Sequence, residues 1–200
     1  SLGFDIRSFV QSFFVKLDEK SIIKKFENEF AEYMEADFCT AFPFARTAIY
    51  YSLKYKNFPA GSEVIMPPIT IKGILDVVLD LDLIPVYVDL DSSHLCYDEI
   101  DLKKKISSNT KAILITYLYG MVPNMQELIK LCREKNLFIL EDFSHNINSE
   151  YNGKKIGNFG DVGIYSSSSI KTLDTFGGGL AITNNPKINS YFLETINQFK

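Results

Sequence analysis

Two reactive side chains, one acid and one amine, each follow a run of apolar residues. Asp142 comes at the end of the run Phe138–Leu140, directly after Glu141. A buried strand that ends in a carboxylate places the acid at the carboxyl edge of a sheet, where open α/β folds bind ligands. Lys171 follows a second run, Val162–Tyr165, and four serines, and three glycines come after it. Hydroxyls that can bind phosphate and an amine that can act as a nucleophile therefore share one loop.

The acid and the amine together indicate a pyridoxal phosphate site. Lysine acts covalently through a Schiff base, and pyridoxal phosphate is the cofactor that depends most on that bond and also needs a carboxylate against its pyridinium nitrogen. Lys171 and Asp142 have the chemistry of that pair. Each also has an ordinary explanation, since an aspartate after a strand often caps a turn, a serine run is usually a loop, and most lysines are solvated. The prediction therefore rests on the order of these residues.

Alternating strands and helices must position these residues. The expected strands are nearly continuous apolar runs at 38–42, 63–66, 84–88, 111–118 and 138–141, and the expected helices are at 43–53, 71–81, 98–106 and 125–135. This alternation is typical of a parallel sheet covered on both faces. Asn152-Gly153 then gives a strong hairpin signal. The later runs 162–166 and 179–183 have no helix-length segment between them, so an antiparallel neighbour is expected there. The predicted fold class is α/β, with three α/β/α layers and a mostly parallel mixed sheet.

Two helices are expected ahead of this sheet. One covers Phe4 to Leu17, and its apolar face, formed by the phenylalanines at 4, 9, 13 and 14, has no evident partner. The next carries Ile22, Ile23, Phe26, Phe30 and Tyr33 on one stripe, with Lys24, Lys25, Glu27 and Glu29 facing out. A last helix follows Pro186.

Composition limits the classes of function. A hydrophobic content of 46% over 200 residues can bury a sizeable core. The net charge of −4 and the dispersed lysines give no nucleic-acid footprint. Three cysteines without metal spacing and two histidines predict no metal site, and no apolar run is long enough for a membrane span. We expect a cytoplasmic protein with reduced thiols.

Several short motifs occur in an order that resembles a known family. They are Phe26–Tyr33, Gly61–Pro67, Pro85–Asp91, Lys111–Ile113, Leu118–Gly120, Glu141-Asp142, Gly153–Asp161, and Lys171 before Gly178-Gly179. Together they resemble the DegT/DnrJ/StrS family of pyridoxal-phosphate-dependent sugar aminotransferases. The resemblance implies the aspartate-aminotransferase fold, specifically the large domain of the fold-type I transferases, and a role in polysaccharide biosynthesis.

The resemblance also implies roles for single residues. Lys171 would form the Schiff base and Asp142 would pair with the ring nitrogen. His145 falls near the phenolic oxygen of the cofactor, and Ser166 falls on the phosphate-binding serine. Arg46 and Thr47 fall at the helix start that receives the same phosphate, although an arginine in a first turn is also common on ordinary surface helices.

The departures from the family pattern concern the cofactor and the chain length. Ile71 stands where the family commonly places an aromatic ring over the cofactor, so aliphatic and weaker stacking is expected there. Ala45 and Gly177 replace a typical glycine and glutamate. The second half that supplies the family's small domain is missing from these 200 residues, so this chain would be a truncated product or a half-length relative. The expected division is a helical segment over 1–35 and a cofactor-binding large domain over 36–200.

The leading hypothesis is an aminotransferase that moves an amino group, with glutamate as the implied donor, to a nucleotide-linked keto-sugar. The implied assembly is a homodimer with the first helix at or near the contact. One alternative is a relative that binds the cofactor or a partner without turnover, favoured by Ile71 and the missing half. Another is a doubly wound nucleotide-binding domain, disfavoured because no glycine-rich fingerprint follows the first strand.

Overall fold

The computed structural model describes residues 6, 10, 20–168, 171–175 and 177–198. The apolar face predicted at the phenylalanines 4, 9, 13 and 14 lies outside these residues. Helices are α2 (Lys20–Met34), α3 (Ala45–Lys56), α4 (Lys72–Asp80), α5 (Glu99–Lys105), α6 (Met125–Glu134) and α7 (Pro186–Asn197). Strands are β1 (Phe38–Phe42), β2 (Glu63–Met66), β3 (Ile84–Tyr87), β4 (Thr110–Thr116), β5 (Phe138–Asp142), β6 (Glu150–Tyr151), β7 (Lys154–Lys155), β8 (Val162–Ser166) and β9 (Gly179–Thr183).

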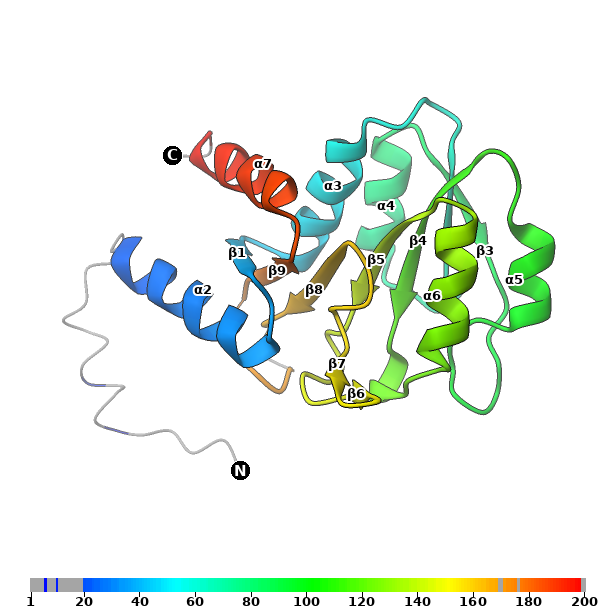
Figure 1. The fold of residues 1–200 in the computed structure, drawn as a ribbon. Coiled ribbons are helices and arrows are strands. Elements are labelled where there is room, and N and C mark those ends of the chain that lie inside the picture. Colours follow the sequence, from blue (N-terminus) through cyan, green and yellow to red (C-terminus); the bar gives the residue numbers. More distant parts are fainter. Residues whose placement is uncertain (1–5, 7–9, 11–19, 169–170, 176, 199–200) are drawn as a thin grey trace.

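A mostly parallel sheet forms the middle layer (Figure 1). Its order is β1-β9-β8-β5-β4-β2-β3, and β9 pairs antiparallel with both of its neighbours. The strands β8, β5, β4, β2 and β3 run parallel to one another. The chain moves outward from β2 to β3 and then returns to β4 on the other side of β2, which makes a switch point between β2 and β4.

Helices cover both faces of this sheet (Figure 1), as the alternation predicted. One apolar core joins α2, α5 and α6 to the sheet, and the other joins α3, α4 and α7 to its opposite face. Successive residues of β4 and β5 alternate between the two cores, since Ile113 and Ile139 belong to the first and Leu114 and Leu140 to the second. The predicted three-layer α/β fold is therefore confirmed.

The interior of α2 differs from its predicted stripe. Phe30 and Met34 are buried, but Ile22 and Ile23 are exposed. Glu27, predicted to face out, is buried, and its carboxylate accepts a hydrogen bond of 2.8 Å from the Ala41 amide. The difference has a simple cause: β1 is the edge strand of the sheet, so the outward-facing Ala41 amide has no strand partner and takes the Glu27 carboxylate as its acceptor.

The glycine-rich turns after β5 follow the sequence signals closely. Asn152 and Gly153 have φ values of 51° and 75°, as a two-residue hairpin between β6 and β7 requires. Further along, Gly157 and Gly160 leave no room for a Cβ, because one would lie 2.6 Å from the Phe143 ring and the other 2.7 Å from the Ile139 carbonyl oxygen. This loop is therefore packed tightly against β5.

Candidate active site

A cavity of about 380 Å³ opens at the carboxyl ends of β4, β5 and β8. The start of α3 and the loop before α4 form its other walls. It lies beside the switch point of the sheet, where open α/β folds bind ligands. Six of the seven site residues predicted from the sequence line it, namely Arg46, Ile71, Asp142, His145, Ser166 and Lys171.

The strand period explains why three strand ends face one cavity. Leu114, Leu140 and Ile164 belong to the core under α3 and α4. Two residues further along each strand are Thr116, Asp142 and Ser166, which therefore project toward the same face. Thr116 and Asp142 are direct partners in the parallel register of β4 and β5.

The two adjacent acids of β5 have different surroundings. Glu141 points to the opposite face, is fully buried, and accepts hydrogen bonds from the Tyr117 hydroxyl and from the amides of Gly157 and Gly160. Burial raises the pKa of Glu141, and these hydrogen bonds oppose the shift. Asp142 lines the cavity, and one of its oxygens accepts a 3.0 Å hydrogen bond from the Ser144 amide. Glu141 therefore anchors a loop, whereas Asp142 is oriented toward the site.

Lys171 lies in the connection between β8 and β9. Its amide donates to the Ser168 carbonyl at 2.9 Å, so the backbone turns there. Ser167 fastens the ends of this connection, because its amide donates to Gly178 and its hydroxyl to Gly177, at 3.2 and 3.1 Å. The described ends of the loop are thus tied together, and Lys171 lines the cavity.

His145 lies at the rim with a defined tautomer. Its Nδ1 accepts a 2.9 Å hydrogen bond from the Tyr119 amide, and the two rings meet edge to face at 5.8 Å. Because Nδ1 is the acceptor, the proton of the neutral imidazole resides on Nε2. Partial burial lowers the pKa of His145 and the charge of Lys171 lowers it further, while Asp142 opposes both. His145 is therefore a neutral donor near neutral pH.

The helix start beside Ser166 depends on a glycine. Gly179 pairs with Ser166 in β8, and a Cβ on Gly179 would lie 2.3 Å from the Ala45 amide nitrogen. The glycine thus lets the first turn of α3 approach the strand end. Phe44 caps that helix without a side-chain hydrogen bond, and the Thr47 amide donates to the Phe44 carbonyl at 3.0 Å. An anion at this helix start would therefore use the amides that precede Thr47. Arg46 adds a positive charge, with its guanidinium 4.2 Å from the centre of the Phe44 ring.

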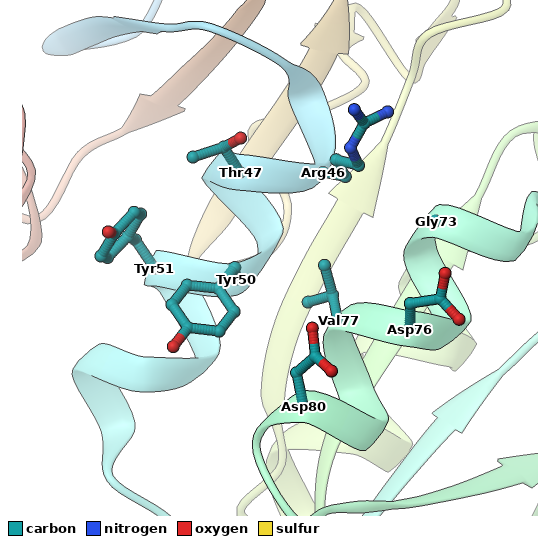
Figure 2. Close-up of a pocket in the computed structure, with 8 residues that line it drawn as sticks. All are labelled: Arg46, Thr47, Tyr50, Tyr51, Gly73, Asp76, Val77 and Asp80. Carbon is teal, nitrogen blue, oxygen red and sulfur yellow. The ribbon is translucent and has the colours of Figure 1, made fainter.

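Thr47 lines a different hollow, shown in Figure 2. This hollow of about 300 Å³ lies between α3, which carries Tyr50, and α4, which carries Asp76 and Asp80. Arg46 borders both the hollow and the cavity. Arg46 and Thr47 therefore share the hollow, and of the two Arg46 alone also lines the cavity.

Thr116 and Ser144 are polar residues of the site that the sequence analysis did not select. Thr116 lines the cavity, and its hydroxyl oxygen is buried with no hydrogen-bond partner among the described residues. Ser144 also lines the cavity, and its hydroxyl accepts a 2.9 Å hydrogen bond from the Ser166 amide. Ser144 follows a predicted strand, so the rule that led to Asp142 could have found it, whereas Thr116 ends the observed strand β4 but lies inside the longer strand predicted over 111–118. Ile71, by contrast, is at its expected place at the start of α4 and is 62% exposed.

Metal-ligating clusters and membrane-spanning helices are both absent from the described part of the chain. No group of three or more His, Cys, Asp or Glu side chains there could hold a metal ion. No helix there has the length and apolar character needed to cross a membrane.

Comparisons with known proteins agree with this geometry. The GDP-perosamine synthase of Escherichia coli O157:H7 is 33% identical over 162 residues, which cover 81% of this chain and 44% of that protein. The structure of Helicobacter pylori PseC, an aminotransferase involved in the biosynthesis of pseudoaminic acid, superposes with a TM-score of 0.80 at 28% identity, covering 86% of this chain and 46% of that one.

A second solved structure carries the cofactor. The E. coli GDP-4-keto-6-deoxy-D-mannose-3-dehydratase with bound hydrated PLP superposes with a TM-score of 0.85 at 26% identity, covering 96% of this chain and 52% of that one. The chain spans about half the length of the curated relatives it matches. The model of the DegT/DnrJ/EryC1/StrS aminotransferase family matches residues 10–198. The chain belongs to the DegT/DnrJ/EryC1/StrS aminotransferase family.

Proposed function

We propose that this chain forms the cofactor-binding large domain of a pyridoxal-phosphate-dependent aminotransferase, with residues 36–200 as that domain. The amino acceptor is a nucleotide-linked keto-sugar and the amino donor is glutamate. One observation carries the proposal: Lys171 and Asp142, from different elements, line the same cavity.

The donor set of the cavity fits pyridoxal phosphate. A carboxylate, an amine, hydroxyls and a guanidinium line it, from Asp142, Lys171, Ser166 and Arg46 among others. The unpartnered hydroxyl of Thr116 also fits a site built for a polar ligand. When bound, the cofactor supplies an aldehyde that condenses with amines and a ring that accepts electrons from the reacting bond.

Each residue of the cavity would then have its own role toward the bound cofactor. Asp142 holds a proton on the ring nitrogen through its carboxylate, which keeps the ring electron-poor. Lys171 Nζ would hold the cofactor and would act as the base for the proton on the substrate carbon next to the amine. The Nε2–H of His145 donates toward the phenolic oxygen, and Ser166 with the start of α3 binds the phosphate. Thr47 is proposed to contribute at the same helix start, although it lines the neighbouring hollow rather than the cavity itself.

The names of relatives support the substrate class. GDP-perosamine synthases and a GDP-sugar dehydratase are similar to this chain. Since one of these is a dehydratase, the reaction type has to be tested directly. We also propose that the protein is a cytoplasmic homodimer. Exposed apolar side chains near the cavity mouth, at Phe44, Ile69 and Ile71, support a further surface that covers the site.

A relative that binds the cofactor without turnover is the second candidate. The observation that favours it is Ile71, an exposed aliphatic side chain at the wall where a ring would stack on the cofactor. Weak stacking would leave the cofactor held mainly by Lys171 and the phosphate contacts.

The test is the half-reaction with glutamate. The protein is loaded with pyridoxal phosphate, glutamate is added, and both the visible absorbance and the 2-oxoglutarate released are measured. The wild type should lose its visible band as one equivalent of 2-oxoglutarate appears. Asp142→Asn should bind the cofactor but slow this step by about 100-fold or more. Asp80→Asn, an exposed carboxylate outside the cavity, is the matched control and should behave as the wild type.

The other outcomes separate the candidates. A bound cofactor that never responds to glutamate in the wild type would favour the relative without turnover. A wild type that binds no cofactor would contradict both candidates.

A further inference from the structure

Thr116 carries an unexplained hydroxyl. Among the described residues, its Oγ1 is the one buried side-chain nitrogen or oxygen atom without a hydrogen-bond partner. Burying a hydroxyl unpaired destabilises a fold, whereas a valine of the same shape would avoid this cost. Such a group at the wall of a cavity indicates that something else supplies the partner.

The position of Thr116 narrows what that partner could be. Thr116 ends β4 and lies directly opposite Asp142 of β5, with both side chains on the face under α3 and α4. The hydroxyl nevertheless makes no hydrogen bond to Asp142. The two polar side chains therefore lie side by side at the wall of the cavity, and a rotation of the Thr116 side chain about χ1 would turn its covered hydroxyl toward a ligand bound there.

The walls of the cavity differ in chemistry on the two sides of Asp142. On the β8 side are Ser166, Lys171 and the start of α3, which suit a phosphate and an amine linkage. On the β4 side is Thr116, and His145 is tied to the same side by the hydrogen bond from the Tyr119 amide. The Thr116 hydroxyl and the Nε2–H of His145 are therefore two potential donors on the β4 side of the cavity.

The shape of pyridoxal phosphate matches this division. Its phosphate arm and its phenolic oxygen lie on opposite edges of the ring, with the aldehyde between them and the nitrogen across from the aldehyde. If Asp142 meets the nitrogen and the β8 side binds the phosphate, the phenolic edge must face β4. That edge carries an acceptor that is negatively charged when the phenol is ionised, and a charged acceptor strengthens a hydrogen bond.

We propose that Thr116 is a cofactor-positioning residue whose hydroxyl donates a hydrogen bond to the phenolic oxygen of bound pyridoxal phosphate, beside His145. This inference rests on the proposed function. It assigns the unpaired hydroxyl a partner and gives the phenolic edge two donors from neighbouring elements. The hydroxyl would then be unsatisfied only while the cavity lacks its cofactor.

The test compares Thr116→Val, which removes the hydroxyl and keeps the shape, with Thr116→Ser, which keeps the hydroxyl. Thr183→Val is the matched control, because the buried Thr183 hydroxyl donates to the Asp161 carbonyl at 2.8 Å and lies outside the cavity. Three quantities are measured: the unfolding temperature without cofactor, the dissociation constant of pyridoxal phosphate, and the pH midpoint of the visible absorbance of the bound cofactor.

Thr116→Val without cofactor should unfold at a temperature equal to or above that of the wild type, because an unsatisfied group is removed. It should bind the cofactor about 10-fold more weakly, the loss expected for one hydrogen bond to a charged group. The pH midpoint should rise, because the ionised phenolic oxygen loses a donor that favours it. Thr116→Ser should stay near the wild type in all three quantities, and Thr183→Val should lower the unfolding temperature without changing the dissociation constant.

Thr116→Val with wild-type affinity and pH midpoint would overturn the inference and leave the proposed function standing. A fall in unfolding temperature like that of Thr183→Val would also overturn it, because the hydroxyl would then have a partner within the protein. If the wild-type protein binds no cofactor, both the proposed function and the role of Thr116 are wrong. This outcome needs no variant, so it is distinguishable from a failure of the Thr116 proposal alone.

Discussion

Gly179→Ala should open the contact between β9 and α3 that brings the helix start to the cavity. A Cβ on Gly179 would lie 2.3 Å from the Ala45 amide nitrogen, 2.5 Å from its Cα and 2.5 Å from the carbonyl carbon of Phe44. All three atoms belong to the backbone, so no side chain can rotate away. Ordinary contact begins at 3.4 Å, and the helix start must therefore move by about 1 Å.

The cost follows from two opposing effects. Overpacking a close contact costs about 1–3 kcal/mol, and the tight backbone contact places this site at the upper end. Replacing glycine by alanine in a strand returns about 0.5–1 kcal/mol, because the unfolded chain loses conformational freedom. The free energy of unfolding should therefore fall by about 2 kcal/mol. The displaced amides of the first turn should also weaken the binding of pyridoxal phosphate by about 10-fold.

Urea unfolding followed by circular dichroism measures the first effect, and titration with the cofactor measures the second. Gly177→Ala is the control, because it lies in the same connection with no atom within 4 Å of its Cβ but has a φ of 142°. It should lose stability through backbone strain and keep its cofactor affinity. If Gly179→Ala has the stability and affinity of the wild type, the close approach does not shape the site.

Three other predictions concern single side chains around the cavity. Gly73→Ala should stabilise α4 by about 1 kcal/mol in urea unfolding, because its nearest neighbour is the movable Arg46 side chain at 3.1 Å; a clear destabilisation would mean that Arg46 is held rigidly. Glu141→Ala should lower the free energy of unfolding by about 3 kcal/mol or more, because three buried donors lose their acceptor; a loss below about 1 kcal/mol would show that the loop is anchored otherwise. Since burial and then Lys171 lower the pKa of His145 from 6.5, the unfolded chain binds its proton more readily, so stability should fall as the pH drops below about 6.5. His145→Asn should flatten that part of the pH profile, and an unchanged slope would count against the assignment.

The sequence predicted the fold well where local patterns decide it. Continuous apolar runs located β2, β5 and β8 to within a residue, and Asn152-Gly153 located the hairpin. The spacing of apolar residues did not predict the buried face of α2 correctly. Glu27 faces inward because its carboxylate accepts a hydrogen bond from the Ala41 amide. That contact arises from tertiary packing and leaves no trace in the helix pattern.

The sequence predicted those site residues that follow a strand-like run and missed those placed by contacts between distant parts of the chain. Asp142 and Lys171 could be chosen because each follows a strand-like run, and the strand period then explains why Asp142 and not Glu141 faces the cavity. Thr47 shows what strand ends do not reveal, because it lies at the helix start beside Arg46 but lines the neighbouring hollow, and its contact with the phosphate stays a prediction. The role of Gly179 was equally hidden, because it depends on a contact with a residue far away in the chain.

The most direct test of the central proposal is to find which lysine binds the cofactor. The protein is incubated with pyridoxal phosphate, reduced with borohydride and digested, and the modified peptide is identified by mass spectrometry. Lys72, exposed and paired with Asp76 near the cavity, provides the control variant Lys72→Ala. We predict that the adduct lies on Lys171, persists in Lys72→Ala and disappears in Lys171→Ala. An adduct on another lysine, or one that survives in Lys171→Ala, would contradict the proposed site.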